Sequence, residues 1–247
     1  MMASLKAEVR KLASVRSTYF IVVICLAMIA LFAGYGDGIK ATAVAIKAPN
    51  WLAHESYVAI VFVGLISALV GLLSFGHEYR YNGIMYTLTA SNSRLKSLLA
   101  KMLAVSAFAV AVSVVFTFFS PLCSYVGIHL SHKVLGPQTF PVWEVLWRCL
   151  FVGWGYAMFA FILVAIIRSQ IGAIVTYLLT PLIGENIISH IFTSTAKYLP
   201  FMSLQSVVPT EMGQQAASTG HYVLVSLVYI VIGLLVSAVL FMRRDAN

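Results

Sequence analysis

The sequence predicts an all-α membrane protein with six transmembrane helices, and three observations predict it. Hydrophobic residues make up 61% of the 247 residues and charged residues only 10%, against about 25% in typical soluble domains. Several stretches approach or exceed the roughly 18 uncharged residues that mark a transmembrane helix. The Lys and Arg residues cluster at the ends of these stretches. A soluble helical core is excluded, because no polar face is available to cover so many apolar helices.

The N-terminal residues 1–17 predict an amphipathic helix that lies in the membrane interface. In helical spacing, Leu5 and Val9 share one face, and Lys6 and Arg10 lie opposite. Such a helix directs its bases toward anionic headgroups. The alternative is a solvated basic leader that only fixes the orientation of the first span. The apolar run that follows is long enough to span, which argues against a cleavable signal peptide.

Six spans follow within a single transmembrane domain that covers residues 1–247. The third is longer than the roughly 20 residues that a bilayer requires, so we expect a tilted helix or a break at Pro121. No soluble domain and no clear repeat interrupts the series. The predicted spans lie near residues 19–35, 57–75, 102–130, 149–167, 171–188 and 222–242.

The distribution of Lys and Arg predicts the orientation. The N-terminus, residues 76–101, Arg168 and the C-terminus together hold 11 of the 16 Lys and Arg residues, and the alternate loops hold 5. Cytoplasmic loops carry the excess of bases, so both termini are predicted to be cytoplasmic in a multi-pass protein of the plasma membrane. Because the bases sit at the ends of spans, the net charge of +8 does not indicate a nucleic-acid partner.

The longest outer segment, residues 189–220, is predicted to be partly re-entrant or interfacial. Its middle, YLPFMSLQSVV, is too apolar for a free loop and too short to span. Such backbone is tolerated at membrane depth only where protein covers it. The shorter outer loops, residues 36–56 and 131–148, carry tryptophans that we expect at the level of the headgroups, namely Trp51, Trp143 and Trp147.

The stretch 76–101 separates two long apolar runs and is rich in charge. It holds the acid Glu78 and four bases, so it must leave the bilayer. It is too long for a simple connection, and it mixes Gly83 with residues that favour a helix. We therefore expect a helical segment broken near Gly83, and a structured cytoplasmic segment of this kind suggests a docking surface. The four bases are Arg80, Arg94, Lys96 and Lys101.

The order of residues in this stretch resembles that of the ABC type-2 exporter permeases. An acidic residue, Glu78, precedes Gly83 by a few positions, and a threonine- and leucine-rich patch, an arginine at the next turn and Lys101 follow. The number and order of the spans agree with this family over the rest of the chain. Two positions depart from a pattern that usually has threonine after the glycine and proline before the arginine, namely Ile84 and Asn92.

The resemblance implies that the chain is the membrane-spanning permease subunit of an ATP-binding cassette exporter. Such a subunit forms half of a translocation path, and a second copy or a related permease forms the other half. Two copies of a separate ATPase would bind ATP and Mg. This chain would bind no cofactor and would not be an enzyme. Consistent with this, the sequence lacks the glycine-rich loop that cradles nucleotide phosphates.

By the same resemblance, the helix in the 76–101 stretch seats in a groove of the ATPase and transmits its closure to the spans. Glu78 and Arg80 would make polar contacts with that partner, and Gly83 would provide the turn. Arg94 and Lys101 could equally be anchors that follow the positive-inside bias. The candidate coupling residues are Glu78, Tyr79, Arg80, Gly83, Arg94 and Lys101.

Glu185 is the acidic residue that lies within a predicted span. Acids inside a membrane are candidates for a proton relay or a substrate-cation site. Because Glu185 lies about one turn from the outer end of the fifth span, a structural role with a partner or water is the alternative. Thr117 and Thr176 could line a path or hydrogen-bond across helices.

No metal site is predicted. The pairs His54–Glu55 and His77–Glu78 lack the second histidine of a metal-binding helix, so we interpret them as ordinary loop residues. The three cysteines give neither a metal motif nor a disulfide framework, although a bridge between Cys123 and Cys149 stays open.

Two other classes of function remain as alternatives. One is a non-transport accessory or immunity-type membrane subunit. The other is an ion-coupled secondary transporter, a class that usually needs intramembrane acids or broken helices at the midplane. The sequence offers little of either. Lipids, amphipathic drugs, peptides and ions all fit the pattern as substrates.

Overall fold

The computed structural model describes residues 2–14, 16–80, 94–209 and 219–243. These residues form helices and short connections, with no strand among them. The helices of the first half are α1 (Met2–Ser14), α2 (Arg16–Ile29), η1 (Ala30–Ile39), η2 (Ala45–Lys47), α3 (Trp51–Val58), α4 (Ile60–Arg80) and α6 (Arg94–Leu130). Those of the second half are α7 (Val142–Ile167), α8 (Gln170–Leu179), η3 (Thr180–Glu185), α9 (Asn186–Ile191), η4 (Thr193–Tyr198), α10 (Pro200–Gln205) and α11 (Thr219–Arg243).

The prediction of an all-α protein with six spans is confirmed. Six helical stretches of the described residues are long and apolar enough to cross a membrane, and their order is the predicted one. Most extend further than the apolar runs in the sequence, because helices continue for a turn or more into polar residues. The stretches are Thr18–Ile39, Trp51–Ser74, Leu95–Leu130, Val142–Ile167, Gln170–Ile191 and Thr219–Arg243.

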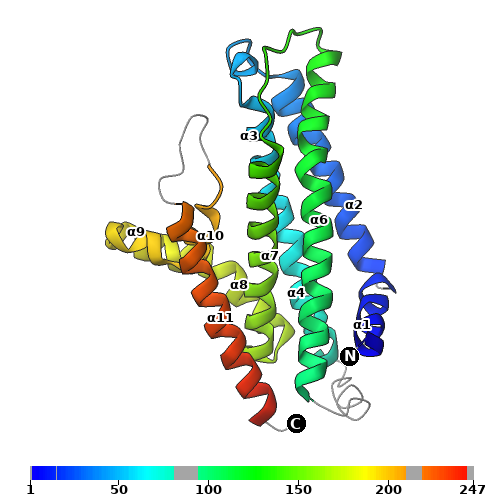
Figure 1. The fold of residues 1–247 in the computed structure, drawn as a ribbon, viewed down its shortest axis with the longest axis vertical. Coiled ribbons are helices and arrows are strands. Elements are labelled where there is room, and N and C mark those ends of the chain that lie inside the picture. The colour runs from blue at the N-terminus through cyan, green and yellow to red at the C-terminus, as the bar shows by residue number, and fades with distance from the viewer. Residues whose placement is uncertain (1, 15, 81–93, 210–218, 244–247) are drawn as a thin grey trace.

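The centre of the bundle is the pair α4 and α7, with α6 packed against both (Figure 1). Glycines allow the close approach of these helices, as is common in membranes. A Cβ atom on Gly71 of α4 would lie 2.6 Å from the Ala157 carbonyl oxygen of α7. One turn earlier in α7, a Cβ atom on Gly153 would clash with the Ser113 hydroxyl of α6.

The first span packs against α6 through its second half, the π-helical η1. A Cβ atom on Gly38 would lie 2.8 Å from the Cα atom of Gly127 in α6. Gly34 and Gly127 are in similarly close backbone contact. The widened π-helical turns therefore bring the end of span one into direct contact with α6.

Helix α6 runs without interruption from Arg94 to Leu130, with Pro121 inside it. The predicted break at Pro121 is therefore wrong. In a membrane helix the carbonyl group that a proline leaves without a partner can be satisfied by neighbouring groups. Pro121 is buried against other helices, so the surrounding packing holds the helix continuous.

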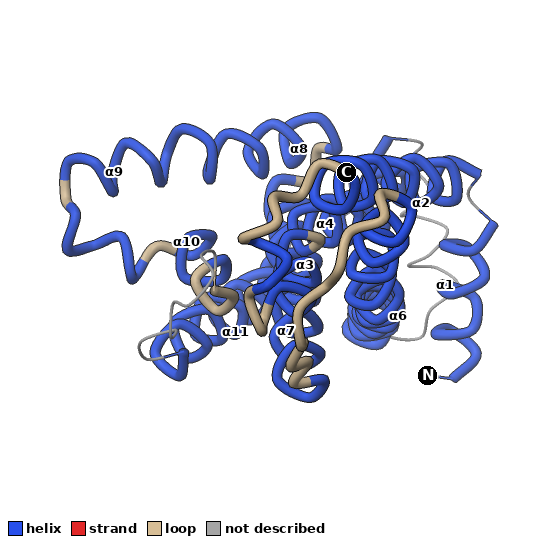
Figure 2. The backbone as a smooth tube through the Cα atoms, turned by 90° about the horizontal axis from the view of Figure 1, so that it is seen from above, coloured by secondary structure: helices blue, strands red, loops and turns tan. Residues whose placement is uncertain are grey.

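The fifth span leaves the bundle. Both views show α8 and α9 extending sideways from the central helices (Figures 1 and 2). Between them lies η3, a π-helical segment that contains Pro181. The chain then returns through η4 to α10, where Phe201 and Leu204 are buried against the protein. A short helix covered by protein agrees with the apolar middle of the segment 189–220.

The connections at the end of the bundle opposite the termini bind each other. The Gln138 side chain donates to the carbonyl groups of Ile46 and Ala48 and accepts from the Leu52 amide. Trp51 is 2% exposed in a small cluster with Ile46 and Ile128. Trp51 therefore starts the second span packed inside the protein, and its position at the headgroup level stays a prediction.

Candidate functional site

The candidate coupling residues that the structure describes, Gly83 not among them, lie toward one end of the bundle. The N-terminal helix, the C-terminal end of α11, the end of α4 and the start of α6 all meet there (Figure 1). We call this the base-rich end; it carries Arg80, Arg94, Arg168 and Arg243. Glu78 and Tyr79 occupy the last turn of α4 together with Arg80. The fold thus brings the two flanks of the predicted coupling stretch to the same end as both described chain termini.

Helices enter the predicted coupling stretch from both sides. Helix α4 continues to Arg80 and α6 begins at Arg94, so these two helices take up the flanks of residues 76–101. The expected turn at Gly83, and with it the predicted coupling helix, falls on residues 81–93 and lies outside the described residues. The coupling helix therefore stays a prediction.

Lys101 is engaged inside the chain. Its side chain is 1% exposed, and its ammonium group donates to the Glu8 carboxylate of α1 across 2.9 Å. A buried charge without its partner costs several kcal/mol, so this pair ties α1 firmly to α6. The sequence offered one signal for it, since Glu8 is the single acid among the first 17 residues. Whether Lys101 also contributes to coupling stays a prediction.

Arg168 joins the helices at the same end. It caps α7 in a left-handed conformation with φ of 57°, and its amide donates to the Val164 carbonyl group. Its guanidinium group donates to the carbonyl oxygen of Leu240 in α11 across 3.4 Å. The turn between the fourth and fifth spans is thereby connected to the last span.

Glu185 holds α10 in place. The carboxylate is 2% exposed, and its two oxygens accept hydrogen bonds from the amides of Phe201 at 2.8 Å and Met202 at 2.7 Å. These amides belong to the first turn of α10, where a negative charge is favourable. The sequence left two roles open for Glu185, one in transport and one structural. Because both carboxylate oxygens accept from backbone amides, the contacts favour the structural role.

Aromatic packing fixes the same segment. The Phe201 ring lies 5.2 Å from Phe159, 5.3 Å from Tyr177 and 6.2 Å from Tyr156, measured between ring centroids. These distances are typical of favourable aromatic pairs. Glu185 and the aromatic rings together attach α10 to the fourth and fifth spans.

The two candidate threonines make helix-internal contacts. The Thr117 hydroxyl is buried and donates to the Ser113 carbonyl oxygen of the same helix across 2.6 Å. The carbonyl oxygen of Thr176 accepts from the Thr180 hydroxyl one turn later. The Thr117 contact favours packing over a role in lining a path, whereas the contact at Thr176 involves its backbone, so the role of the Thr176 side chain stays a prediction.

Glu55 is a buried acid that sequence reasoning missed. The interpretation of His54–Glu55 as loop residues is wrong, because both lie in α3 inside the second candidate span. Glu55 is 2% exposed, and one carboxyl oxygen lies 3.0 Å from the Ser124 hydroxyl of α6. A signal was present: no Gly or Pro follows Pro49 before the apolar run, so the helix could have been extended back to that point.

The described residues form no metal site and no disulfide bond. No group of three His, Cys, Asp or Glu residues is placed to hold a metal ion there. The bridge left open between Cys123 and Cys149 is absent, and both cysteines are free thiols. The Cys149 thiol lies 3.7 Å from the Ser56 carbonyl oxygen.

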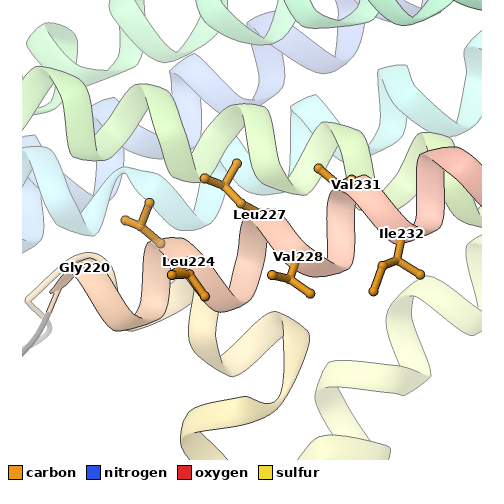
Figure 3. Close-up of a pocket in the computed structure, with 7 residues that line it drawn as sticks. Gly220, Leu224, Leu227, Val228, Val231 and Ile232 are labelled. Carbon is orange, nitrogen blue, oxygen red and sulfur yellow. The ribbon is translucent and has the colours of Figure 1, made fainter.

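The outward face of α11 is apolar and slightly hollowed. A groove of about 380 Å³ follows this helix, and Figure 3 shows its aliphatic side chains along one side. A second groove, of about 440 Å³, runs where α1 and α2 meet α6. The α11 groove is lined by Gly220, Val223, Leu224, Leu227, Val228, Val231 and Ile232.

Comparison with known proteins agrees with this architecture. A family model described as ABC-2 family transporter protein matches residues 4–185, which is well over half of the chain. The match includes α1, the first four spans and the stretch between α4 and α6. No curated protein matches the chain. The chain belongs to the ABC-2 transporter family and is a membrane component of an ABC-type transport system.

Proposed function

We propose that the chain is the permease subunit of an exporter that is driven by a separate ATPase. The match to the ABC-2 family over residues 4–185 carries this proposal. Two ATPase subunits bind ATP and Mg, and this chain supplies half of the path through the lipid bilayer. A second copy or a related permease supplies the other half. Nucleic acid has no part in the function.

The base-rich end is the cytoplasmic end. It gathers the segments that hold 11 of the 16 Lys and Arg residues, and such an excess is typical of cytoplasmic loops. Both termini are then cytoplasmic in the plasma membrane. In a variant without native cysteines, single cysteines near Lys47, Lys133 and Lys197 should react with a membrane-impermeant reagent on intact cells. Cysteines near Arg94 and Arg168 should not, and outside labelling near Arg94 would overturn the orientation.

Force from the ATPase enters through the ends of α4 and α6. Glu78, Tyr79 and Arg80 contact the ATPase, with Gly83 at the turn and Arg94 beside it. The helical continuity of α4 to Arg80 and of α6 from Arg94 supports this, because each helix extends from the base-rich end into the packed centre. A movement at the ATPase would therefore shift the two helices that pack against α7.

The incomplete burial of three spans supports a two-permease path. In the most apolar part of the first, fifth and sixth spans, 17% of residues are buried by the described chain. A second permease would cover part of these faces, and lipid would cover the remainder. The path would then form where the two permeases meet.

Co-purification tests the proposal. The full chain is expressed together with the ATPase encoded beside it, isolated in lipid nanodiscs, and assayed for bound ATPase and for ATP turnover. A stable complex whose transport needs ATP and survives collapse of the ion gradients is the expected result. Transport by the isolated chain, driven by an ion gradient, would instead establish a secondary transporter. A stable chain that binds no ATPase would indicate an accessory subunit.

A further inference from the structure

The second span carries a buried carboxyl group with an unusual set of hydrogen-bond partners. One Glu55 oxygen lies 3.0 Å from the Ser124 hydroxyl oxygen, and the same hydroxyl oxygen lies 3.1 Å from the Ala33 carbonyl oxygen. Glu55 belongs to α3, Ser124 to α6 and Ala33 to η1. Three separate segments therefore meet at one serine hydroxyl, which is fully buried.

The number of hydrogens available for hydrogen bonds decides which protonation state of Glu55 fits this geometry. A serine hydroxyl has one hydrogen to donate, and a backbone carbonyl group can only accept. An ionised carboxylate can also only accept. With Glu55 ionised, Ser124 could donate to one of its two neighbours but not to both. With Glu55 protonated, the carboxyl group donates to Ser124, Ser124 donates to Ala33, and both hydrogen bonds form.

The surroundings of Glu55 also disfavour a negative charge. Its side chain is 2% exposed, and among the described residues no ion pair joins it to a base. The charged groups nearby are Asp37 of η1, close enough for its charge to act on Glu55, and His54, which interacts with Asp37. A second acid beside a buried acid makes ionisation of both costly. Asp37 and His54 are half-buried.

We propose that Glu55 binds a proton in the folded chain, and that this proton closes a latch between the end of span one, α3 and α6. Removal of the proton would turn the Ser124 hydroxyl toward the carboxylate and release the Ala33 carbonyl group. The end of span one would then keep its glycine contacts with α6 and the hydrogen bonds that Lys133 donates to the Ile39 and Ala41 carbonyl groups, but it would lose its link to Ser124. The proposal concerns the end of the bundle opposite the base-rich end and does not depend on the ATPase.

Glu185 provides the matched control, because the two buried acids have opposite partners. Glu185 accepts from two backbone amides, which only donate, so it suits an ionised carboxylate. Glu55 faces a hydroxyl that must itself donate to a carbonyl group. The same substitution, glutamate to glutamine, should therefore have different spectroscopic consequences at the two sites.

Infrared difference spectroscopy on the full chain in nanodiscs at neutral pH tests the bound proton directly. The wild-type spectrum should contain the C=O stretch of a protonated carboxyl group, and Glu55→Gln should remove it. Glu185→Gln should leave that band in place. Ser124→Ala should shift the band, because the carboxyl group loses its acceptor. A wild-type spectrum without a protonated-carboxyl band, or a band that persists in Glu55→Gln, would overturn the proposal.

Thermal unfolding as a function of pH gives a second readout. A glutamine amide can donate to Ser124 as the protonated acid does, so Glu55→Gln should unfold near the wild-type temperature at a pH below the ordinary glutamate pKa of about 4.3. Because the proton stabilises the folded state, raising the pH until Glu55 loses it should destabilise the wild type. Glu55→Gln has no such proton and should lack that loss of stability. Identical pH profiles for the two proteins would contradict the latch.

Discussion

The central and peripheral spans of this molecule differ in packing, and their hydropathy does not predict the difference. In the most apolar part of the second and fourth spans, 67% and 61% of residues are buried by protein, against 17% in the first, fifth and sixth. The sixth span has the highest mean hydropathy of all. Lipid tails are as apolar as leucine, so hydropathy identifies a span without telling whether protein or lipid surrounds it.

The peripheral elements are attached by polar contacts. The Lys101–Glu8 pair joins α1 to α6, and the Glu185 carboxylate joins the fifth span to α10. The Ser203 and Ser226 hydroxyls, 3.1 Å apart, join α10 to α11. The comparison teaches that close packing stabilises the centre, whereas hydrogen bonds and an ion pair add to the packing that positions the elements around it.

The largest expected contrast comes from one substitution made in both regions. Leu72 of α4 is 1% exposed and Leu235 of α11 is 62% exposed. Leu72→Ala leaves a cavity between packed helices and should reduce the free energy of unfolding by about 2–5 kcal/mol. Leu235→Ala changes a lipid-facing side chain and should alter it by less than about 0.5 kcal/mol. Chemical denaturation of the two variants in the same lipid measures both losses. Equal losses in the free energy of unfolding would contradict the difference between central and peripheral spans.

Breaking the ion pair between α1 and α6 should have the next largest effect. Lys101→Ala leaves the Glu8 carboxylate without this partner in a mostly buried position, and we expect a loss of about 3 kcal/mol. The exposed Lys47→Ala serves as the control and should change little. In a double-mutant cycle, adding Glu8→Ala to Lys101→Ala should cost much less than Glu8→Ala alone. Additive losses would show that the two side chains are not coupled.

Removal of the Glu185 charge should have a smaller effect. Glu185→Gln keeps one oxygen that can accept from an α10 backbone amide. It places its own NH2 group, which can only donate, opposite the second backbone amide. We therefore expect a loss of about 1.5 kcal/mol in unfolding free energy. Most transport should remain, because the contacts of Glu185 are structural. Complete loss of transport in a folded, correctly assembled variant would identify Glu185 as a pathway residue.

The smallest expected effect concerns the contact between α10 and α11. Ser226→Ala removes the hydrogen bond to Ser203, and hydrogen bonds between membrane helices are worth about 0.6 kcal/mol on average. Unfolding free energy should fall by about that amount. Ser237→Ala is a suitable control, because Ser237 is buried in the same helix and its hydroxyl makes no hydrogen bond to the described residues. An equal loss in the two variants would mean that the Ser203–Ser226 contact adds nothing.

The class of fold and the number of spans were predictable because both follow from long apolar runs. The ends of the spans were not, since helices continue into polar residues; for this reason Glu55 was assigned to a loop and the stretch 76–101 was taken as one connection. Of the two alternatives for the long third span, a tilt or a break at Pro121, the break does not occur, because α6 continues through Pro121, which is buried against neighbouring helices.

The contacts within the candidate site were less accessible to sequence reasoning. Lys101 and Glu8 lie 93 positions apart, and Glu185 meets amides of a short helix whose position depends on tertiary packing. Side chains that pair over such separations leave no local pattern. The candidate coupling residues, in contrast, came from a local pattern, and the fold brings the flanks of that stretch to one end of the bundle.

The central claim is that an ATPase drives this chain through the end of α4, and a coupling assay tests it most directly. The chain is reconstituted with its ATPase, and complex recovery, ATP turnover and export are measured together for Glu78→Ala, Arg80→Ala and Gly83→Val. The Lys47→Ala variant, changed at the opposite end, is the control. Loss of one partner from a buried charged contact typically costs about 2–5 kcal/mol, so the first two variants should lose ATPase binding tens-fold or uncouple hydrolysis from export, while the helices remain folded. Gly83→Val should behave alike if the turn needs a positive φ. Wild-type values of all three quantities in these variants would contradict the claim.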